Sequence, residues 1–323
     1  MNYVLAIHGG AGTIQPGVDE TPYHAALREA AAAGEAVLAG GGSALDAVTQ
    51  AVQALEDCIL FNAGRGSVYT SDGVHEMDAI VMDGSKLTAG AVAGVATVRN
   101  PVLLARAVME KSPCVLLAGS GAERFAREQG FEAMAPEYFA SKARLAQLRQ
   151  AQAAGSGSVL DHDGASQLAQ AAAIEPAKPE PLDPDRKYGT VGAVALDRHG
   201  NLASAVSTGG MTNKRPGRIG DTPIVGAGCY ANNASVAVAA TGSGEYFMRA
   251  VVAHDVAARM QYGGATLAEA SHAVVHDKLV ALGGDGGIIA IGRDGALSMP
   301  FNTTGMYRAS VREGEPIVTA IFA

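Results

Sequence analysis

The sequence predicts an α+β fold in which one sheet packs on another and helices cover the outside. Strand-like and helix-like segments fall into separate groups along the chain, whereas a doubly wound fold would alternate them. The 323 residues suffice for one large domain or two ordinary ones, and 48% hydrophobic residues allow a large core. The 41 glycines are nearly twice the usual share of about 7%, so tight turns and close backbone packing are expected.

The first half of the chain begins with a strand at residues 4–7 and is then mainly helical. Helical periodicity covers five segments: 22–38, 44–56, 101–110, 121–129 and 137–153. The second of them opens with Ser43, which has Asp46 three residues on, as in a capped helix start. Alternating residues at 68–70 and 75–82 predict a hairpin around a Ser-Asp-Gly turn.

The second half is predicted to start with strands, continue with two helices and end with short strands. A hairpin is expected from 191–197 and 202–207, joined by an Arg-His-Gly-Asn turn. The remaining strand patterns cover 225–229, 235–240, 288–291, 297–299 and 317–322. The two helical patterns lie at 244–260 and 266–282.

Charge and cysteine content exclude several classes of function. The net charge of -8 is spread without long runs of one sign, which argues against nucleic acid or an anionic membrane as partner. Cys58, Cys114 and Cys229 are too few and too scattered for a disulfide framework or a zinc site. Neither a basic leader nor an apolar stretch of about 18 residues is apparent, so the expected location is the cytoplasm.

Thr190 is the first candidate for a catalytic residue. It follows Gly189 and the segment 174–187, whose four prolines and seven charges suit an exposed linker. A threonine hydroxyl is a weak nucleophile without a base. Cleavage after Gly189 would supply one, because the new α-amine has a reference pKa of about 7.7 to 8.0. The alternative is that Thr190 merely opens the strand at 191–197, as most threonines in such positions do.

Three further segments are candidates to complete a site around Thr190. Backbone N–H groups of 241–245, between a strand and a helix, are suited to hold an anion such as the oxygen of a tetrahedral intermediate. Arg218 and Asp221 suit the carboxylate and the ammonium group of an amino acid. Thr208 ends the strand that pairs with the one Thr190 starts, so the two residues are expected to be neighbours. The first segment is equally compatible with a tight helix entry, and the second with a solvated loop.

Eight motifs occur in an order that is typical of one family. They are Ile-His-Gly-Gly-Ala-Gly at 7–12, Leu-Glu-Asp-Cys at 55–58 with Phe-Asn-Ala-Gly-Arg-Gly at 61–66, Glu-Met-Asp-Ala at 76–79, Gly-Thr-Val-Gly-Ala-Val at 189–194, Ser-Thr-Gly-Gly at 207–210, Arg-Ile-Gly-Asp at 218–221, Gly-Ala-Gly-Cys-Tyr-Ala at 226–231 and Thr-Gly at 241–242. The chain resembles the plant-type L-asparaginases and isoaspartyl peptidases, which are N-terminal-nucleophile hydrolases. The likeness covers almost the whole length except about residues 150–187, and eight ordered motifs are more specific than any one of them.

This resemblance implies a role for each site residue. Thr190 would be the nucleophile, and autocleavage before it would free its α-amine. The products would be an α chain of 1–189, with a flexible tail at about 150–189, and a β chain of 190–323. Thr208 would hydrogen-bond to it and help activate it. The other implied site residues are Arg218 for the substrate α-carboxylate, Asp221 for its α-amine, Thr241 and Gly242 for the oxyanion, Gly244 at the border of the substrate and Asn62 close by.

The resemblance also implies a fold, an assembly and an ion. The family fold is a four-layer αββα sandwich, here a single domain over 1–323, and the usual assembly is a dimer of αβ units. No cofactor is expected for catalysis, but a structural sodium ion is, and oxygen ligands suit such a hard cation. Its ligands would be the main-chain carbonyls of Leu55, Glu56, Cys58, Phe61, Ala63 and Arg65.

The expected activity is hydrolysis of a β-aspartyl amide through an acyl-enzyme on Thr190. Free L-asparagine and β-aspartyl dipeptides share every atom that Arg218, Asp221 and Thr190 would touch, so the sequence does not choose between them. The Ala- and Pro-rich tail before Gly189 follows no fixed family motif, which leaves the rate of cleavage open. Two alternatives stay open as well. A hydrolase like aspartylglucosaminidase would cut a glycosylated asparagine, and a non-catalytic protein that binds a small ligand would remain uncut.

Overall fold

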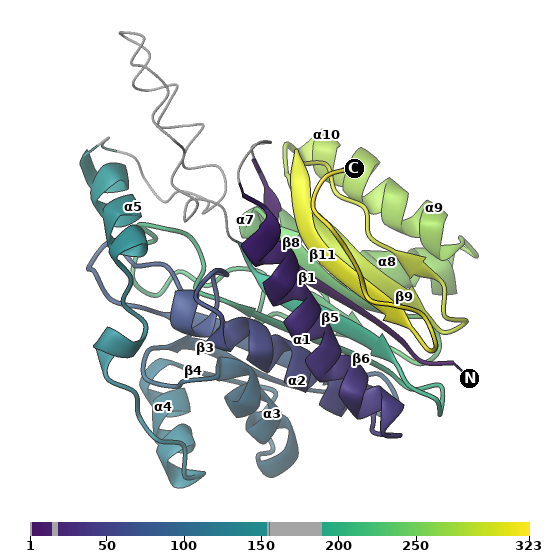
Figure 1. The fold of residues 1–323 in the computed structure, drawn as a ribbon, viewed down its shortest axis with the longest axis horizontal. Helices are drawn as coiled ribbons and strands as arrows, with labels where there is room; N and C mark the ends of the chain where they lie inside the picture. Colours follow the sequence, from purple (N-terminus) through teal and green to yellow (C-terminus); the bar gives the residue numbers. More distant parts are fainter. Residues whose placement is uncertain (1, 15–18, 154, 156–188) are drawn as a thin grey trace, which may run out of the picture.

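The computed structural model describes residues 2–14, 19–153, 155 and 189–323. The predicted linker at 174–187, and most of the predicted tail, lie outside the described residues. Within the described part, two sheets carry helices on their outer faces (Figure 1). None of the described helices is both long and apolar enough to cross a membrane.

The larger sheet has eight strands, and its order brings distant segments of the chain side by side. From edge to edge the strands are β12 (Val318–Ala320), β11 (Gly305–Arg312), β1 (Val4–Gly12), β5 (Val191–Leu196), β6 (Leu202–Thr208), β2 (Met77–Asp83), β3 (Thr88–Val95) and β4 (Leu116–Ala118). All neighbours pair antiparallel except β3 and β4. The centre of the sheet therefore joins the first strand of the chain to the hairpin that begins just after Thr190.

The smaller sheet has four antiparallel strands. In spatial order they are β10 (Leu297–Ser298), β9 (Gly286–Gly292), β8 (Val236–Gly242) and β7 (Cys229–Ala231). On β8, Val238 packs against helices, whereas its neighbour Ala239 belongs to the core between the two sheets. The smaller sheet therefore has an apolar face on each side.

The strands of the larger sheet also serve two cores. On β1, Leu5 and Ile7 pack against helices, whereas Val4 and Ala6 join the core between the sheets. Successive side chains of a strand point to opposite faces, so a strand that is apolar throughout must be covered on both sides. The structure therefore confirms a mixed fold of large sheets and helices.

Helices cover the outer faces of both sheets (Figure 1). Those on the side of the larger sheet are α1 (Thr21–Ala39), α2 (Ala44–Asp57), α3 (Pro101–Lys111) and α4 (Gly119–Glu128). By contrast, α5 (Lys142–Ala153) contacts a loop, where Nε of Arg144 donates to the carbonyl of Gly66 at 2.9 Å. Those on the side of the smaller sheet are α7 (Gly244–Ala250), α8 (Val252–Gln261), α9 (Leu267–His272), the π-helical η4 (Ala273–Leu279) and α10 (Val280–Leu282). The described residues also form the short 3₁₀ helices η1 (Gly64–Gly66) and η2 (Pro136–Tyr138).

Local signals in the sequence explain the elements that were predicted best. Ser43 caps α2 by accepting a hydrogen bond from the backbone N–H of Asp46 at 3.1 Å, as expected. The β5–β6 hairpin is confirmed, and Asp197 closes its turn by accepting the N–H groups of His199 and Asn201, both at 2.9 Å. The predicted helices at 22–38, 101–110, 121–129 and 266–282, and the strands at 235–240, 288–291, 297–299 and 317–322, are present with shifted ends.

Three strands, β3, β4 and β11, are not predicted from the sequence. β3 consists mostly of alanine, glycine and valine, and its small residues serve packing against α3. A Cβ atom at Gly90 would lie 2.2 Å from the carbonyl oxygen of Ala105 on that helix. A strand that must let a helix approach so closely lacks the large apolar residues that mark strands in a sequence.

Two predicted strands are wrong. Residues 68–70 form no strand, because Thr70 makes only an isolated bridge to Lys214, and β2 pairs with β3 and β6 instead. The segment 225–229 is mostly a turn, closed by a hydrogen bond from Ala227 N to Ile224 O at 3.0 Å, so that β7 begins only at Cys229.

Three boundaries also differ from those predicted. The strand expected at 4–7 continues through its glycines to Gly12, because β11 pairs with it to that residue around an irregularity between His8 and Gly10, whereas β5 pairs with it only as far as His8. The helix expected at 244–260 is interrupted at Val251, whose φ of 51° is left-handed. The helix expected at 137–153 begins only at Lys142, after η2.

Candidate functional site

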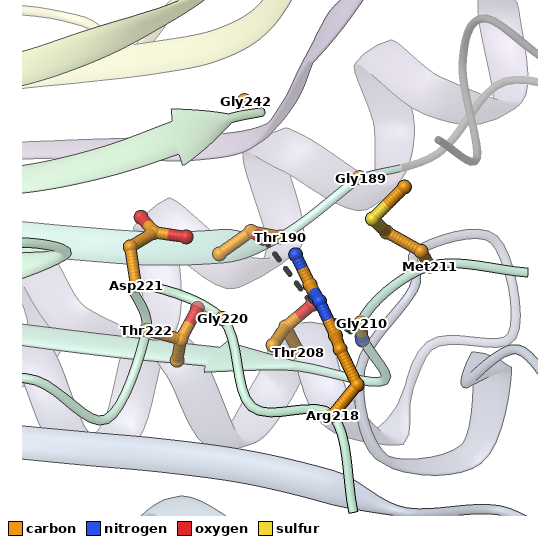
Figure 2. A pocket seen from close by; sticks show the side chains of 10 residues that line it. All are labelled: Gly189, Thr190, Thr208, Gly210, Met211, Arg218, Gly220, Asp221, Thr222 and Gly242. Atoms are coloured by element: carbon orange, nitrogen blue, oxygen red, sulfur yellow. Dashed lines mark hydrogen bonds between the residues drawn. The ribbon is translucent and has the colours of Figure 1, made fainter. Parts of the chain in front are cut away.

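Thr190 lies at the start of β5, beside the end of β6. Val191 pairs with Ser207 in the register of these strands, which puts Thr190 opposite Thr208. The hydroxyl of Thr190 donates a hydrogen bond to Oγ1 of Thr208 at 3.2 Å (Figure 2). Antiparallel pairing predicted that the two residues are neighbours, and the structure adds their direct contact.

A glycine turn holds Thr208 in place. The N–H of Gly210 donates to Oγ1 of Thr208 at 2.9 Å, and Thr208 is 3% exposed. Asn62 fixes the same turn. Its side-chain Nδ2 donates to the carbonyl of Gly210 at 2.7 Å, and its main-chain carbonyl accepts the N–H of Gly209 at 3.0 Å. Asn62 is buried and does not line the pocket, so its effect on the site passes through this turn.

The chain just before Thr190 passes very close to β1. A Cβ atom at Gly10 would lie 2.6 Å from the backbone nitrogen of Gly189 and 2.8 Å from its Cα. Gly10 also has a φ of 113°, which strains any residue with a side chain. Position 10 therefore requires glycine on two grounds, and β1 sets the path on which the chain reaches Thr190.

A small pocket opens around Thr190, with Arg218 and Asp221 on either side of it in Figure 2. The pocket has a volume of about 350 Å³ including its open mouth. It is lined by Gly189, Thr190, Thr208, Gly210, Met211, Arg218, Gly220, Asp221, Thr222 and Gly242. The pocket brings together the residues that the sequence predicts to attack the substrate, to activate the nucleophile, to bind the charged groups of the substrate and to stabilise the oxyanion. It also includes Met211 and Thr222, for which the sequence gives no signal.

Gly244 allows the two charged side chains to approach one point. A Cβ atom there would lie 2.8 Å from Oδ1 of Asp221 and 3.0 Å from Nη2 of Arg218. Oδ2 of Asp221 is buried and has no hydrogen-bond partner among the described residues. Burial raises the pKa of this carboxyl from 3.8 to about 7, although the charge of Arg218 opposes the shift. Such an oxygen is suited to receive an ammonium group.

Thr241 and Gly242 lie at the end of β8. Thr241 is buried, and its Oγ1 accepts the N–H of Ala11 at 3.3 Å, which leaves the hydroxyl proton for another acceptor. Gly242 lines the pocket with a φ of 151°, and a Cβ atom there would lie 2.3 Å from the carbonyl oxygen of Asp285. Of the two residues predicted for the oxyanion, only Gly242 lines the pocket.

His8 is a buried neighbour of Thr190 that the sequence does not single out within its glycine-rich motif. Its ring lies against the main chain of Thr190, and neither ring nitrogen makes a hydrogen bond of good geometry with a described residue. A Cβ atom at Gly192 would lie 2.4 Å from Nε2 of His8, so glycine is needed there. Burial lowers the pKa of His8 to about 3, and the ring is therefore neutral at physiological pH.

Lys214 and Asp78 form a second buried group behind the site. Lys214 is fully buried, and its Nζ donates to the carbonyl of Glu76 at 2.7 Å. Asp78 is also buried and lies opposite Thr208 in the register of β2 and β6. Asp78, a charged residue inside a largely apolar strand, is a sequence signal for this pair, whereas Lys214 gives none.

The loop predicted to hold sodium folds around two glycines. A Cβ atom at Gly64 would lie 2.5 Å from the carbonyl oxygen of Glu56, and one at Gly66 would lie 2.1 Å from that of Phe61. One hydrogen bond from within the loop is accepted by each carbonyl of Leu55, Cys58, Phe61 and Ala63. A second lone pair remains on each, so this donor set fits a hard cation. Among the described side chains, no three of His, Cys, Asp or Glu are grouped to hold a metal.

Glu56 is a fully buried carboxyl that links α2 to the end of β6. Its Oε1 accepts the hydroxyl of Ser207 at 2.6 Å and the N–H of Val102 at 2.9 Å, whereas Oε2 has no partner in the described part of the chain. Burial raises the pKa of Glu56 from 4.5 to about 8, against the lowering effect of these hydrogen bonds. Glu56 therefore carries a proton at neutral pH.

The buried proton of Glu56 should make the stability of the fold depend on pH. Because the folded-state pKa is raised, its stabilising contribution is complete below about pH 4.5 and is lost as pH rises through about 8. Glu56→Gln keeps a neutral side chain of the same shape, so the wild-type melting temperature should fall relative to this variant by roughly 2 °C per pH unit in that window. Calorimetry over the window measures the difference, and parallel curves would contradict the assignment.

Comparisons with known proteins identify the family of the chain. The asparaginase family matches residues 1–321. The isoaspartyl peptidases of Salmonella typhimurium and Escherichia coli are each 55% identical over 323 residues, which is 99% of this chain and 98% and 96% of theirs. A probable isoaspartyl peptidase/L-asparaginase of Arabidopsis thaliana is 40% identical over 327 residues, 99% of either chain. The resemblance that the eight motifs indicate is thereby confirmed: the chain belongs to the asparaginase family.

Proposed function

We propose that the protein is an isoaspartyl peptidase and L-asparaginase that hydrolyses β-aspartyl amides with Thr190 as its nucleophile. The observation that carries the proposal is the 3.2 Å contact between the hydroxyls of Thr190 and Thr208, in a pocket that Arg218 and Asp221 also line. Full-length relatives named for this activity support the substrate class.

The first step in this proposal is cleavage of the chain's own Gly189–Thr190 bond. Oγ of Thr190 attacks the Gly189 carbonyl carbon, the C–N bond breaks, and the hydroxyl proton passes to the departing nitrogen. Water then hydrolyses the resulting ester and leaves chains 1–189 and 190–323. The close approach of Gly189 to Gly10 supports this step, because a tightly held peptide is limited in the conformations it can adopt.

The freed α-amine of Thr190 then acts as the base in turnover. It accepts the proton as Oγ attacks the β-carbonyl carbon of the substrate, and Thr241 and Gly242 stabilise the negative oxygen that forms. The leaving amine takes the proton, and water releases aspartate from the acyl-enzyme. Thr208 supports the attack, since its Oγ1 already accepts the Thr190 hydroxyl and the N–H of Gly210.

The charged walls of the pocket would select an amino acid. Arg218 binds the α-carboxylate, and the unpartnered Oδ2 of Asp221 binds the α-amine. Neither group touches the leaving amine, so ammonia and an amino acid are both acceptable there. The substrate class is therefore defined by a free α-carboxylate and a free α-amine on the aspartyl unit.

Ionisation of Asp221 should appear in the pH dependence of activity. The pKa of Asp221 in the free enzyme is raised to about 7, so protonation below that pH removes the charge that binds the ammonium group. For the wild-type enzyme, kcat/KM should fall as pH drops through about 7. The kcat/KM of Asp221→Asn should no longer show this ionisation. At pH above 7, it should be lower than that of the wild type by roughly 10²-fold. A profile of the variant that keeps the same ionisation would assign it to another group.

We also propose the family's architecture and assembly for this chain. The two sheets with helices on their outer faces are compatible with a four-layer αββα sandwich in one domain. A dimer of αβ units is the expected assembly, to be tested by sedimentation. A sodium ion would be held by the carbonyls of Leu55, Glu56, Cys58, Phe61, Ala63 and Arg65, where it would supply positive charge that fixes the loop.

A comparison of four substrates tests the proposed activity. The processed protein should hydrolyse a β-aspartyl dipeptide and L-asparagine in preference to N-acetylglucosaminyl-asparagine, and it should not hydrolyse the matching α-aspartyl dipeptide. The α-aspartyl dipeptide is the control, because its α-carboxylate is blocked by the peptide bond. Preferred cleavage of the glycosylated asparagine would favour an aspartylglucosaminidase. An uncut chain without activity on any of the four would favour a binding protein.

A further inference from the structure

Arg218 is held by a second charged residue that none of the proposed steps uses. Nε of Arg218 donates to Oε1 of Glu245 at 3.0 Å, and Nη2 donates to Oε2 at 2.9 Å. Glu245 is the second residue of α7, directly after Gly244. The side chain of Arg218 is 16% exposed and that of Glu245 is 53% exposed, so the pair lies at the mouth of the pocket with the arginine inside.

The two hydrogen bonds use one edge of the guanidinium group. A planar guanidinium offers paired donors along its Nε–Nη2 edge and again along its Nη1–Nη2 edge. Glu245 takes the first edge, and the described residues provide no hydrogen-bond partner for Nη1. Figure 2 shows the end of Arg218 extending toward Thr190. The edge that remains is therefore the one available to an incoming carboxylate.

The surrounding backbone leaves this guanidinium little freedom. A Cβ atom at Gly220 would lie 3.0 Å from Nη1, and one at Gly244 would lie 3.0 Å from Nη2. The group thus sits between two glycines, with Glu245 fixing its rotation. An arginine that is fixed before the ligand arrives loses less conformational freedom on binding.

We propose that Glu245 is a positioning residue for substrate recognition: it clamps the Nε–Nη2 edge of Arg218 and so presents the other edge to the α-carboxylate of a β-aspartyl substrate. This inference rests on the proposed function and extends it to a residue outside the lining of the pocket. It assigns to Glu245 an effect on binding of the carboxylate alone, with no part in bond cleavage or in processing of the chain. A carboxylate that merely competed with substrate for Arg218 would have the opposite effect on affinity.

The variant Glu245→Gln tests the proposal through a KM-against-kcat split. Its amide keeps the shape but offers only one acceptor oxygen to two donors. KM for a β-aspartyl dipeptide and the inhibition constant of L-aspartate should each rise about 3- to 10-fold, with kcat within about twofold of the wild type. The inhibition constant of the α-carboxamide of L-aspartate should not change, because that ligand has no α-carboxylate. Glu245→Asp, which keeps the charge, should lie between Glu245→Gln and the wild type.

A matched control is Glu110→Gln, which removes the carboxylate of an arginine pair formed with Arg106 away from the pocket. It should behave as the wild type in every assay. A Glu245→Gln enzyme with unchanged KM, with lower KM, or with an equal loss for the α-carboxamide would overturn the inference, and lower KM would identify a competitor. If Glu245→Gln does not fold, a KM of Glu245→Asp equal to that of the wild type would overturn the inference instead. Failure of the proposed function is a separate result, since the wild type itself would then hydrolyse no β-aspartyl substrate.

Discussion

Replacement of Thr190 by alanine should leave the protein as one chain of 323 residues and lower kcat/KM for a β-aspartyl dipeptide by about 10⁴-fold or more. The variant loses the hydroxyl that donates to Thr208 at the end of β6, and with it both the attack on Gly189 and the attack on substrate. Denaturing gels and intact mass report the processing, and a coupled assay for released aspartate reports the turnover.

The matched control for this change is Thr190→Ser, which keeps the hydroxyl and removes one methyl group. It should still be cleaved into two chains and should keep measurable activity. Normal processing of Thr190→Ala would rule out Thr190 as the group that attacks Gly189. An uncut but fully active Thr190→Ala variant would rule it out as the nucleophile in turnover as well.

Replacement of Gly10 by alanine should slow processing at least about tenfold and lower the unfolding free energy by about 1 to 3 kcal/mol. The new Cβ atom would lie 2.6 Å from the nitrogen of Gly189, and the φ of 113° is unfavourable for alanine. The chain before Thr190 must shift away from β1, which changes the distance between Oγ and the carbonyl it attacks. A time course on denaturing gels with urea unfolding of the uncut form measures both effects.

The control variant Gly130→Ala separates the effect of a positive φ from the effect of the contact between residue 10 and Gly189. Gly130 has a φ of 81°, but a Cβ atom there would meet nothing within 4 Å. This control should lose some stability and process at the wild-type rate. Equal processing rates for Gly10→Ala and the wild type would show that the approach of Gly10 to Gly189 does not control cleavage.

The fold was predictable where a local signal exists and was missed where tertiary packing decides. Ser43 and the turn at Asp197 identify α2 and the β5–β6 hairpin, because capping and turn chemistry are encoded in a few adjacent residues. β3 was missed because Gly90 and its small neighbours serve the close approach of α3. The break at Val251 carries no signal at all in a sequence that is otherwise regularly helical.

The site was predictable as a set of motifs but not as a geometry. Strand pairing alone indicates that Thr190 and Thr208 are neighbours, and charge alone suggests that Arg218 and Asp221 bind an amino acid. The sequence cannot show that Gly244 lets those two groups converge, or that Glu245 occupies one edge of Arg218. These facts depend on how β8 and α7 meet the loop before β7, which is a long-range property of the fold.

The central claim is that Thr190 becomes the first residue of a separate chain, because its α-amine must serve as the base. N-terminal sequencing combined with intact mass of the active protein tests this most directly. The account predicts two species that correspond to residues 1–189 and 190–323, the second beginning Thr-Val-Gly. Fully active material that yields only the sequence starting at Met1, with the mass of the uncut chain, would contradict it.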